Sequence, residues 1–167
     1  LDNLTSIGGC LEISSCPLDS LSGLDNVTTI GDYVKIINNY TLNSLSGLNN
    51  LTSIGDYLKI SGNKSLISLL GLDNVTTVGG SLTIWQNDTL INVNGLINLS
   101  SISGDLEVFD NNNLISLAGL SNINANSIEN LWIEDNDKLS ACHTQSICEY
   151  LAQPNGSVQI LNNYQGC

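Results

Sequence analysis

A block of about 24 residues recurs six times along the chain, and no other feature limits the possible folds as strongly. The repeat units begin at Leu1, Leu24, Leu48, Leu72, Leu96 and Leu120, so successive units start 23, 24, 24, 24 and 24 residues apart. Within each unit the apolar residues keep fixed places, which in the third unit are Leu48, Leu51, Ile54, Leu58, Ile60, Leu66 and Leu69. A fixed period of this length indicates a repeat architecture in which neighbouring units share one core.

Counted from the start of a unit, these apolar residues occupy places 1, 4, 7, 11, 13, 19 and 22. Only places 11 and 13 alternate with the period of two of a β-strand, so we expect one strand of about five residues in each unit. One unit alone cannot bury seven inward side chains. The units must therefore stack about 4.8 Å apart, with their strands forming one parallel sheet and a continuous core.

Glycine and asparagine mark the expected corners of each unit. Glycine closes five units, and asparagine recurs at place 16 of the units and once more in the C-terminal tail. A side-chain amide at a tight corner can pair with the backbone groups that a turn leaves free, so we interpret this asparagine column as structural. Its members are Asn39, Asn63, Asn87, Asn111, Asn136 and Asn163.

The run Ile-x-x-x-Leu-x-Ile-x-x-Asn-x-x-Leu, seen from Ile54 to Leu66, resembles a leucine-rich repeat. It is most similar to the receptor L-domain-like repeats of exported proteins of Bacteroidota. Most units depart from the commonest pattern by one extra residue before the first strand leucine and one before the final leucine. The resemblance covers about residues 1–141 and implies a right-handed β-solenoid, or leucine-rich-repeat superhelix, with turns of about 24 residues. It is specific for the fold and says little about the function.

The pattern changes after Leu139, and we expect residues 142–167 to form a C-terminal cap on the six units of residues 1–141. A helix is predicted at about 144–152, with Ile147, Cys148 and Leu151 on its inner face, and the Pro-Asn-Gly sequence at 154–156 ends it. A final strand is predicted at about 157–161. The tail also resembles the terminal segment of the same bacterial surface proteins.

Five cysteines lie near the two ends of the chain, which suits an exported protein with a disulfide in the cap. Any two of Cys142, Cys148 and Cys167 could meet. We favour Cys148 with Cys167, because that bridge would join the helix to the last strand and close a loop worth roughly 3 kcal/mol; Cys142 stays a possible partner. A direct bond between Cys10 and Cys16 looks strained.

The net charge of −12, with four lysines and no arginine, argues against nucleic acid and against anionic membrane surfaces as partners. No apolar run reaches the roughly 18 residues needed for membrane insertion. The expected location is secreted or cell-surface, and no cofactor is expected.

Places 10, 12 and 14 of each unit point away from the predicted core and should stack into a shallow open face. Five of the eight aromatic residues fall on it, and exposed aromatic side chains often mark recognition surfaces. Aromatic residues also suit exposed strands for packing reasons alone. The candidate binding residues are Tyr33, Lys35, Tyr57, Lys59, Trp85, Glu107, Phe109, Trp132 and Glu134.

We expect neither catalysis nor a metal site. The only histidine, His143, is next to Cys142, and adjacent side chains point apart. A glycosidase built on Glu107 and Glu134 would need a desolvated pocket that a flat face rarely supplies. The acidic corner runs at 110–113 and 134–137 could attract calcium, but turn chemistry explains both.

The sequence therefore favours an extracellular recognition or adhesion module that binds a glycan or a protein through the aromatic-bearing face. The alternative is a structural spacer, or a self-assembling component of a surface or filament that has no soluble ligand.

Overall fold

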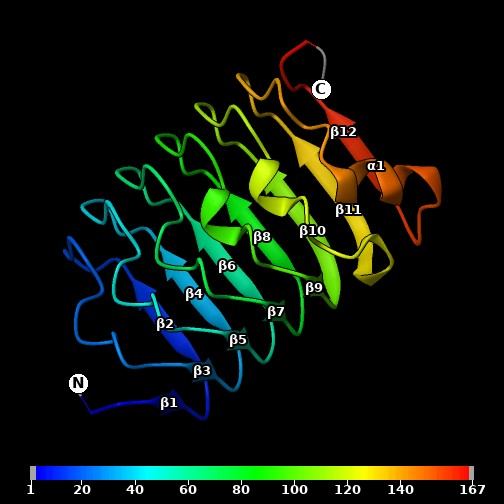
Figure 1. Ribbon diagram of the computed structural model, residues 1–167. Helices are drawn as coiled ribbons and strands as arrows, with labels where there is room; N and C mark the ends of the chain where they lie inside the picture. The colour runs from blue at the N-terminus through cyan, green and yellow to red at the C-terminus, as the bar shows by residue number, and fades with distance from the viewer. Residues whose placement is uncertain (1–2, 166–167) are drawn as a thin grey trace.

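The computed structural model describes residues 3–165, in which parallel strands form two sheets beside one α-helix. The larger sheet has seven strands: β2 (Leu11–Ser14), β4 (Val34–Ile37), β6 (Leu58–Ser61), β8 (Leu82–Trp85), β10 (Gly104–Phe109), β11 (Ile128–Glu134) and β12 (Val158–Leu161). Figure 1 shows the turns of chain stacked one behind another from the N-terminal to the C-terminal end. The predicted parallel stacking is confirmed, and the architecture is compatible with a solenoid-like repeat fold.

The register of the seven-stranded sheet aligns equivalent places of neighbouring units. Val34 pairs with Leu58, which pairs with Leu82, and the next place along the strand aligns Lys35 with Lys59. A slip of one residue would turn every apolar strand residue to the solvent, so the repeat pattern itself sets this register.

The prediction of a single sheet is wrong, because a second parallel sheet runs beside the first. It consists of five two-residue strands: β1 (Ser6–Ile7), β3 (Thr29–Ile30), β5 (Ser53–Ile54), β7 (Thr77–Val78) and β9 (Ser101–Ile102). Places 6 and 7 are extended just before the glycine corner. Two residues are too few to show an alternating pattern, which is why the sequence did not reveal these strands.

The core runs along the inside of the stack and is made by the repeated apolar places. In the third unit all seven of these side chains are at most 2% exposed. Burial of each such side chain is worth about 1.5–3 kcal/mol relative to water. Short 3₁₀ helices, η1 (Asn94–Leu96), η2 (Ala118–Leu120) and η3 (Ala125–Ser127), occur in the later units.

A ladder of buried asparagine amides joins successive units at place 16. The Oδ1 atom of Asn63 accepts hydrogen bonds from the backbone N–H of Asn39 at 3.0 Å and from its Nδ2 at 3.2 Å. The Nδ2 of Asn63 in turn donates to the carbonyl of Ile36 at 2.8 Å. The same pattern recurs at Asn87, Asn111, Asn136 and Asn163.

The main strands end in a residue with a left-handed backbone at place 15. This residue is Gly62 in the third unit, with φ of 67°, and Asn38 and Asp110 are equivalent to it, with φ of 56° and 54°. Asparagine and aspartate tolerate this conformation better than most residues. At the other end of the unit, Gly47 has φ of 108°, and a Cβ atom there would collide with the carbonyl of Leu21 in the preceding unit.

The helix α1 (Gln145–Ala152) lies over the C-terminal end of the core (Figure 1). The Thr144 side chain caps it by accepting a hydrogen bond from the backbone N–H of Ile147. Its buried residues are Ser146, Ile147 and Tyr150, while Leu151 is 43% exposed and Cys148 is exposed. The predicted inner face was therefore right at Ile147 and wrong at Cys148 and Leu151.

Tyr150 anchors this helix. Its hydroxyl donates to the carbonyl of Glu129 at 2.7 Å and accepts from the backbone N–H of Gly156 at 3.2 Å. The hydroxyl of Ser146 donates to the carbonyl of Leu120 at 2.7 Å. Because of these hydrogen bonds, the side of the helix that faces the core carries Ser146 and Tyr150. The apolar residues alone had predicted that Cys148 and Leu151 would face the core.

The prediction that Cys148 bonds to Cys167 is wrong, because Cys148 carries a free, exposed thiol. Among the cysteines of residues 3–165, Cys142, which is 5% exposed, is the one that is disulfide-bonded. Cys167 lies outside the described residues. Cys10 and Cys16 are also free thiols.

Candidate ligand-binding site

All nine candidate binding residues lie on the outward side of the seven-stranded sheet and are partly exposed. Neither tryptophan belongs to the core. We call this surface, made by places 10, 12 and 14, the open face. The pattern of the open face continues along all the units, but the nine candidate residues gather around two separate hollows, one at places 10 and 12 and the other at places 12 and 14.

Two tyrosines stack at place 10. The rings of Tyr33 and Tyr57 have centroids 4.8 Å apart and planes inclined by 4°. The next residue at place 10 is Ser81, so the stack of rings ends at Tyr57. A hydrogen bond with the Cys10 side chain raises the pKa of Tyr33 to about 12, so this phenol stays protonated at neutral pH.

Lys35 and Lys59 are register partners on adjacent strands, although like charges placed opposite each other are unfavourable. The two amines lean toward different aromatic rings. The Nζ of Lys35 lies 4.4 Å from the centroid of Tyr33, and that of Lys59 lies 5.6 Å from the centroid of Trp85. A hydrogen bond with the Tyr57 side chain raises the pKa of Lys35 above its ordinary value, so its positive charge persists. Within residues 3–165, neither lysine forms a salt bridge.

A hollow with a volume of about 660 Å³ opens between these lysines and two glutamates. We call it the lysine slot. Lys35, Tyr57 and Lys59 line one side, and Glu107 and Glu129 line the other. The remaining lining residues are Asp56, Gly79, Gly80, Ser81, Thr83, Ser103 and Gly104.

Small residues at places 9 and 10 create the lysine slot. The second and third units have Asp-Tyr at these places, the fourth has Gly80 and Ser81, and the fifth has Gly104 at place 9. Gly80 must also stay small because a Cβ atom there would lie 2.9 Å from the backbone nitrogen of Tyr57. The slot is therefore a local departure from the repeat, placed on a regular sheet.

Hydrogen bonds hold the polar walls of the slot in place. Thr83 donates from its hydroxyl to the Oε2 of Glu107 at 2.6 Å. Asp105, at place 10 of the fifth unit, does not line the slot. Its carboxylate instead accepts hydrogen bonds from Asn130, from the backbone N–H at 3.2 Å and from Nδ2 at 2.7 Å. The hydrogen bond from Thr83 therefore holds the Glu107 carboxylate in place on the wall of the slot.

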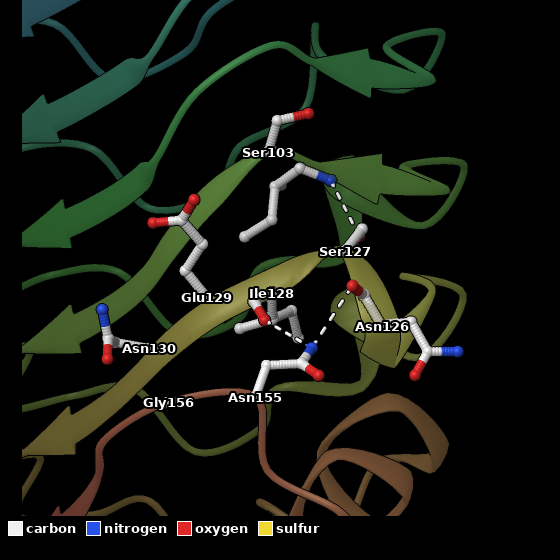
Figure 2. A pocket seen from close by; sticks show the side chains of 9 residues that line it. Ser103, Asn126, Ser127, Ile128, Glu129, Asn130, Asn155 and Gly156 are labelled. Atoms are coloured by element: carbon white, nitrogen blue, oxygen red, sulfur yellow. Dashed lines mark hydrogen bonds between the residues drawn. The ribbon is translucent and has the colours of Figure 1, made fainter.

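A second, polar hollow of about 540 Å³ adjoins the slot and shares Ser103 and Glu129 with it. Figure 2 shows the Asn155 amide at its base, donating to the carbonyls of Asn126 and Ile128 at 3.2 and 2.9 Å. Ser127 accepts a hydrogen bond from the backbone N–H of Ile102 there. Together the two hollows form a polar trough that continues from the open face toward the loop after α1.

The remaining aromatic residues of the open face do not line the slot: Trp85 and Phe109 lie at place 14, and Trp132 lies at place 12. Phe109, Trp132 and Glu134 line a smaller hollow of about 220 Å³. The ring of Trp85 packs against Phe109 with centroids 5.6 Å apart, and its Nε1 donates to Asp110 at 3.0 Å. Glu107 and Glu134 therefore line different hollows, which gives no support to a paired-carboxylate glycosidase.

Of the nine candidate residues, Lys35, Tyr57, Lys59 and Glu107 meet in the lysine slot, and Phe109, Trp132 and Glu134 meet in the smaller hollow. Tyr33 and Trp85 support these groups through ring contacts. Sequence reasoning missed the slot and the contributions of Ser81, Thr83 and Glu129. The replacement of Asp-Tyr by Gly-Ser at places 9 and 10 was the available signal.

Two kinds of feature are absent from residues 3–165. No group of three His, Cys, Asp or Glu side chains there is arranged to hold a metal ion. In the same part of the chain, no helix has both the length and the apolar character needed to cross a membrane.

Comparison with known families matches the model of the receptor L domain to residues 52–153, which is more than half of the chain. The chain belongs to the receptor L domain family. Receptor L domains are extracellular or cell-surface domains that bind ligands and do not catalyse reactions. No curated protein and no solved structure matches this chain.

Proposed function

We propose that this receptor L domain is a recognition or adhesion module that binds a glycan or a protein through its open face. Support comes from family membership together with the concentration of aromatic and cationic side chains on one side of the sheet. Two of the four lysines of a chain with net charge −12 lie there side by side. Exposed tyrosine and tryptophan residues are the commonest anchors of binding surfaces.

We also propose that the molecule is secreted or displayed at a cell surface, as in the exported proteins of Bacteroidota that its repeats resemble. In this proposal the units wind as a right-handed leucine-rich-repeat superhelix with turns of about 24 residues, capped by residues 142–167. A rigid stack of this kind presents a fixed face to a partner without having to order it on binding.

The test compares tryptophan removal on the open face with aromatic removal elsewhere. Trp85→Ala and Trp132→Ala should each weaken binding at least tenfold on a glycan array or in capture of defined surface proteins, while the melting temperature falls by only a few degrees. Tyr40→Ala is the matched control, because Tyr40 is 58% exposed and lies outside the open face. Equal binding by all three variants would contradict recognition through the tryptophan-bearing part of this face.

A second candidate function is self-association, and one observation favours it. Ile67, Ile91 and Ile115 occupy place 20 of three successive units, are 41–52% exposed, and are joined by backbone hydrogen bonds of 3.1 and 3.0 Å. Stacked exposed isoleucines form an apolar stripe of the kind that often marks a contact between proteins.

Light scattering distinguishes this alternative from ligand recognition. If the stripe mediates assembly, the parent protein forms dimers or ordered polymers, and Ile91→Ser returns it to monomers. A parent protein that stays monomeric at high concentration excludes assembly through the stripe and leaves the open face as the functional surface.

A further inference from the structure

The stack of tyrosines at place 10 ends where a third ring could fit. Adjacent strands are about 4.8 Å apart, and the rings of Tyr33 and Tyr57 follow the same 4.8 Å spacing. A flat ring placed above Ser81 would lie against the free side of Tyr57 and continue the stack. The volume of the lysine slot, about 660 Å³, accommodates such a ring with its substituents.

The polar groups around this position restrict what the ring can be. Ser81, Lys59 and Glu107 all line the slot. An aromatic side chain from a protein partner would remove water from the Lys59 ammonium and from the second Glu107 oxygen without offering a hydrogen bond in exchange, and such desolvation is costly. A sugar ring has an apolar face that packs on tyrosine and hydroxyls at its rim that pair with the polar groups.

The two lysines specify the charge of the ligand. They are neighbours in register, form no salt bridge within residues 3–165, and both open into the slot. A carboxylate between the two amines would offset their mutual repulsion. On the opposite side, Glu107 and Glu129 would accept hydrogen bonds from hydroxyls and repel a second anionic group.

We propose that the lysine slot binds an acidic saccharide, with one sugar ring stacked on Tyr57 and its carboxylate between Lys35 and Lys59. The neutral remainder of the saccharide extends past Glu129 and Ser103 into the adjoining polar hollow (Figure 2). This assignment rests on the proposed recognition function and names the ligand class for the same face.

The experiment uses a panel of oligosaccharides ending in glucuronic, galacturonic or sialic acid, each paired with a neutral counterpart that lacks the carboxylate. Isothermal titration calorimetry should show at least one acidic member binding tenfold or more tightly than its neutral partner. A panel in which no acidic member binds better than its neutral counterpart would overturn the proposal.

Ser81→Tyr fills the slot with the side chain that place 10 carries in two other units, so the fold should tolerate it. It should weaken binding of the acidic saccharide at least tenfold. Lys59→Gln should also weaken acidic binding about tenfold while leaving the neutral counterpart unchanged. Lys64→Gln is the matched control, because Lys64 is exposed at place 17 and does not line the slot, and its Kd should stay within twofold.

Circular dichroism establishes that each variant is folded, and Lys59→Gln tests the assignment independently of the space filled by tyrosine. Saccharide binding that survives in both Ser81→Tyr and Lys59→Gln places the ligand elsewhere and refutes the slot. If the panel fails but a protein ligand is captured in a Trp85-dependent manner, the saccharide assignment falls and the recognition function stands. Loss of that protein ligand in Ser81→Tyr would instead assign the slot to a protein side chain.

Discussion

The inner and outer sides of the same strands differ in how strictly they repeat. On the inside, place 11 reads Val34, Leu58, Leu82, Leu106 and Leu131, all fully buried. On the outside, place 12 of the same strands reads Lys35, Lys59, Thr83, Glu107 and Trp132. The inner columns are uniform because each unit is packed by its neighbours. The outer columns are free of that constraint, so departures there create the lysine slot without disturbing the stack.

The sharpest test of this contrast removes one amide from the buried ladder. Asn87→Ala deletes bonds to Asn63, Ile60 and Asn111 and leaves buried backbone groups unpaired. We expect a loss of about 3–5 kcal/mol in the free energy of unfolding, measured by denaturant titration. The control Asn74→Ala removes an exposed amide with one bond, to Asn49, and should cost less than about 1 kcal/mol. Similar losses in both variants would show that the ladder is not a special source of stability.

A smaller effect is expected in the cap, where one hydroxyl holds the helix. Tyr150→Phe keeps the buried ring and removes the hydrogen bonds to Glu129 and Gly156. The free energy of unfolding should fall by about 1–2 kcal/mol, and amide exchange should quicken in α1 and β12 more than in β6. Tyr164→Phe, at a residue that is 56% exposed, should have no measurable effect. Uniform acceleration along the chain would instead show that the cap and the units unfold together.

The smallest effect concerns the pH dependence of ligand binding on the open face. The pKa of Lys35 is raised by its hydrogen bond with Tyr57, and a raised lysine pKa preserves the charge at higher pH. Binding of an acidic saccharide should therefore stay constant from about pH 6 to 9 and weaken only as the pH passes the lysine range, above about 10.4. A decline already between pH 7 and 9, followed by calorimetry, would show that a different group carries the charge.

Much of the fold was predictable, because the residues that face the core must be apolar in every unit, and this requirement appears in the sequence as a regular period. The apolar places and the asparagines of place 16 mark the inside of every unit. The two-residue strands β1 and β3 escaped because their pattern is too short to recognise. The rotation of α1 escaped because Tyr150 and Ser146 are anchored by hydrogen bonds, which apolar spacing does not report.

The candidate site was only half predictable for a related reason. The aromatic and lysine residues were found because they stand out from a largely polar face. The slot itself exists because Gly80, Ser81 and Gly104 lack the large side chains found at the same places in other units. Small residues of this kind indicate a hollow only when they are compared with the Asp-Tyr pairs of the neighbouring units. Glu129 lies between Ile128 and Leu131, where the pairing of β11 with β10 shifts by one residue, and the repeat pattern does not predict the position of a side chain at such an irregularity.

The asparagine ladder also explains how units of unequal length coexist in one molecule. The amide bonds span 23 residues between Cys16 and Asn39, 24 between Asn63 and Asn87, 25 between Asn111 and Asn136, and 27 between Asn136 and Asn163. Each interval closes with the same bond, so the phase of the next strand is restored. The extra residue of the 25-residue interval lies at the register shift near the start of β11, and the 27-residue interval contains the helix α1. The scaffold can thus take up added residues at a strand irregularity or in the cap without shifting the core places of the following strand.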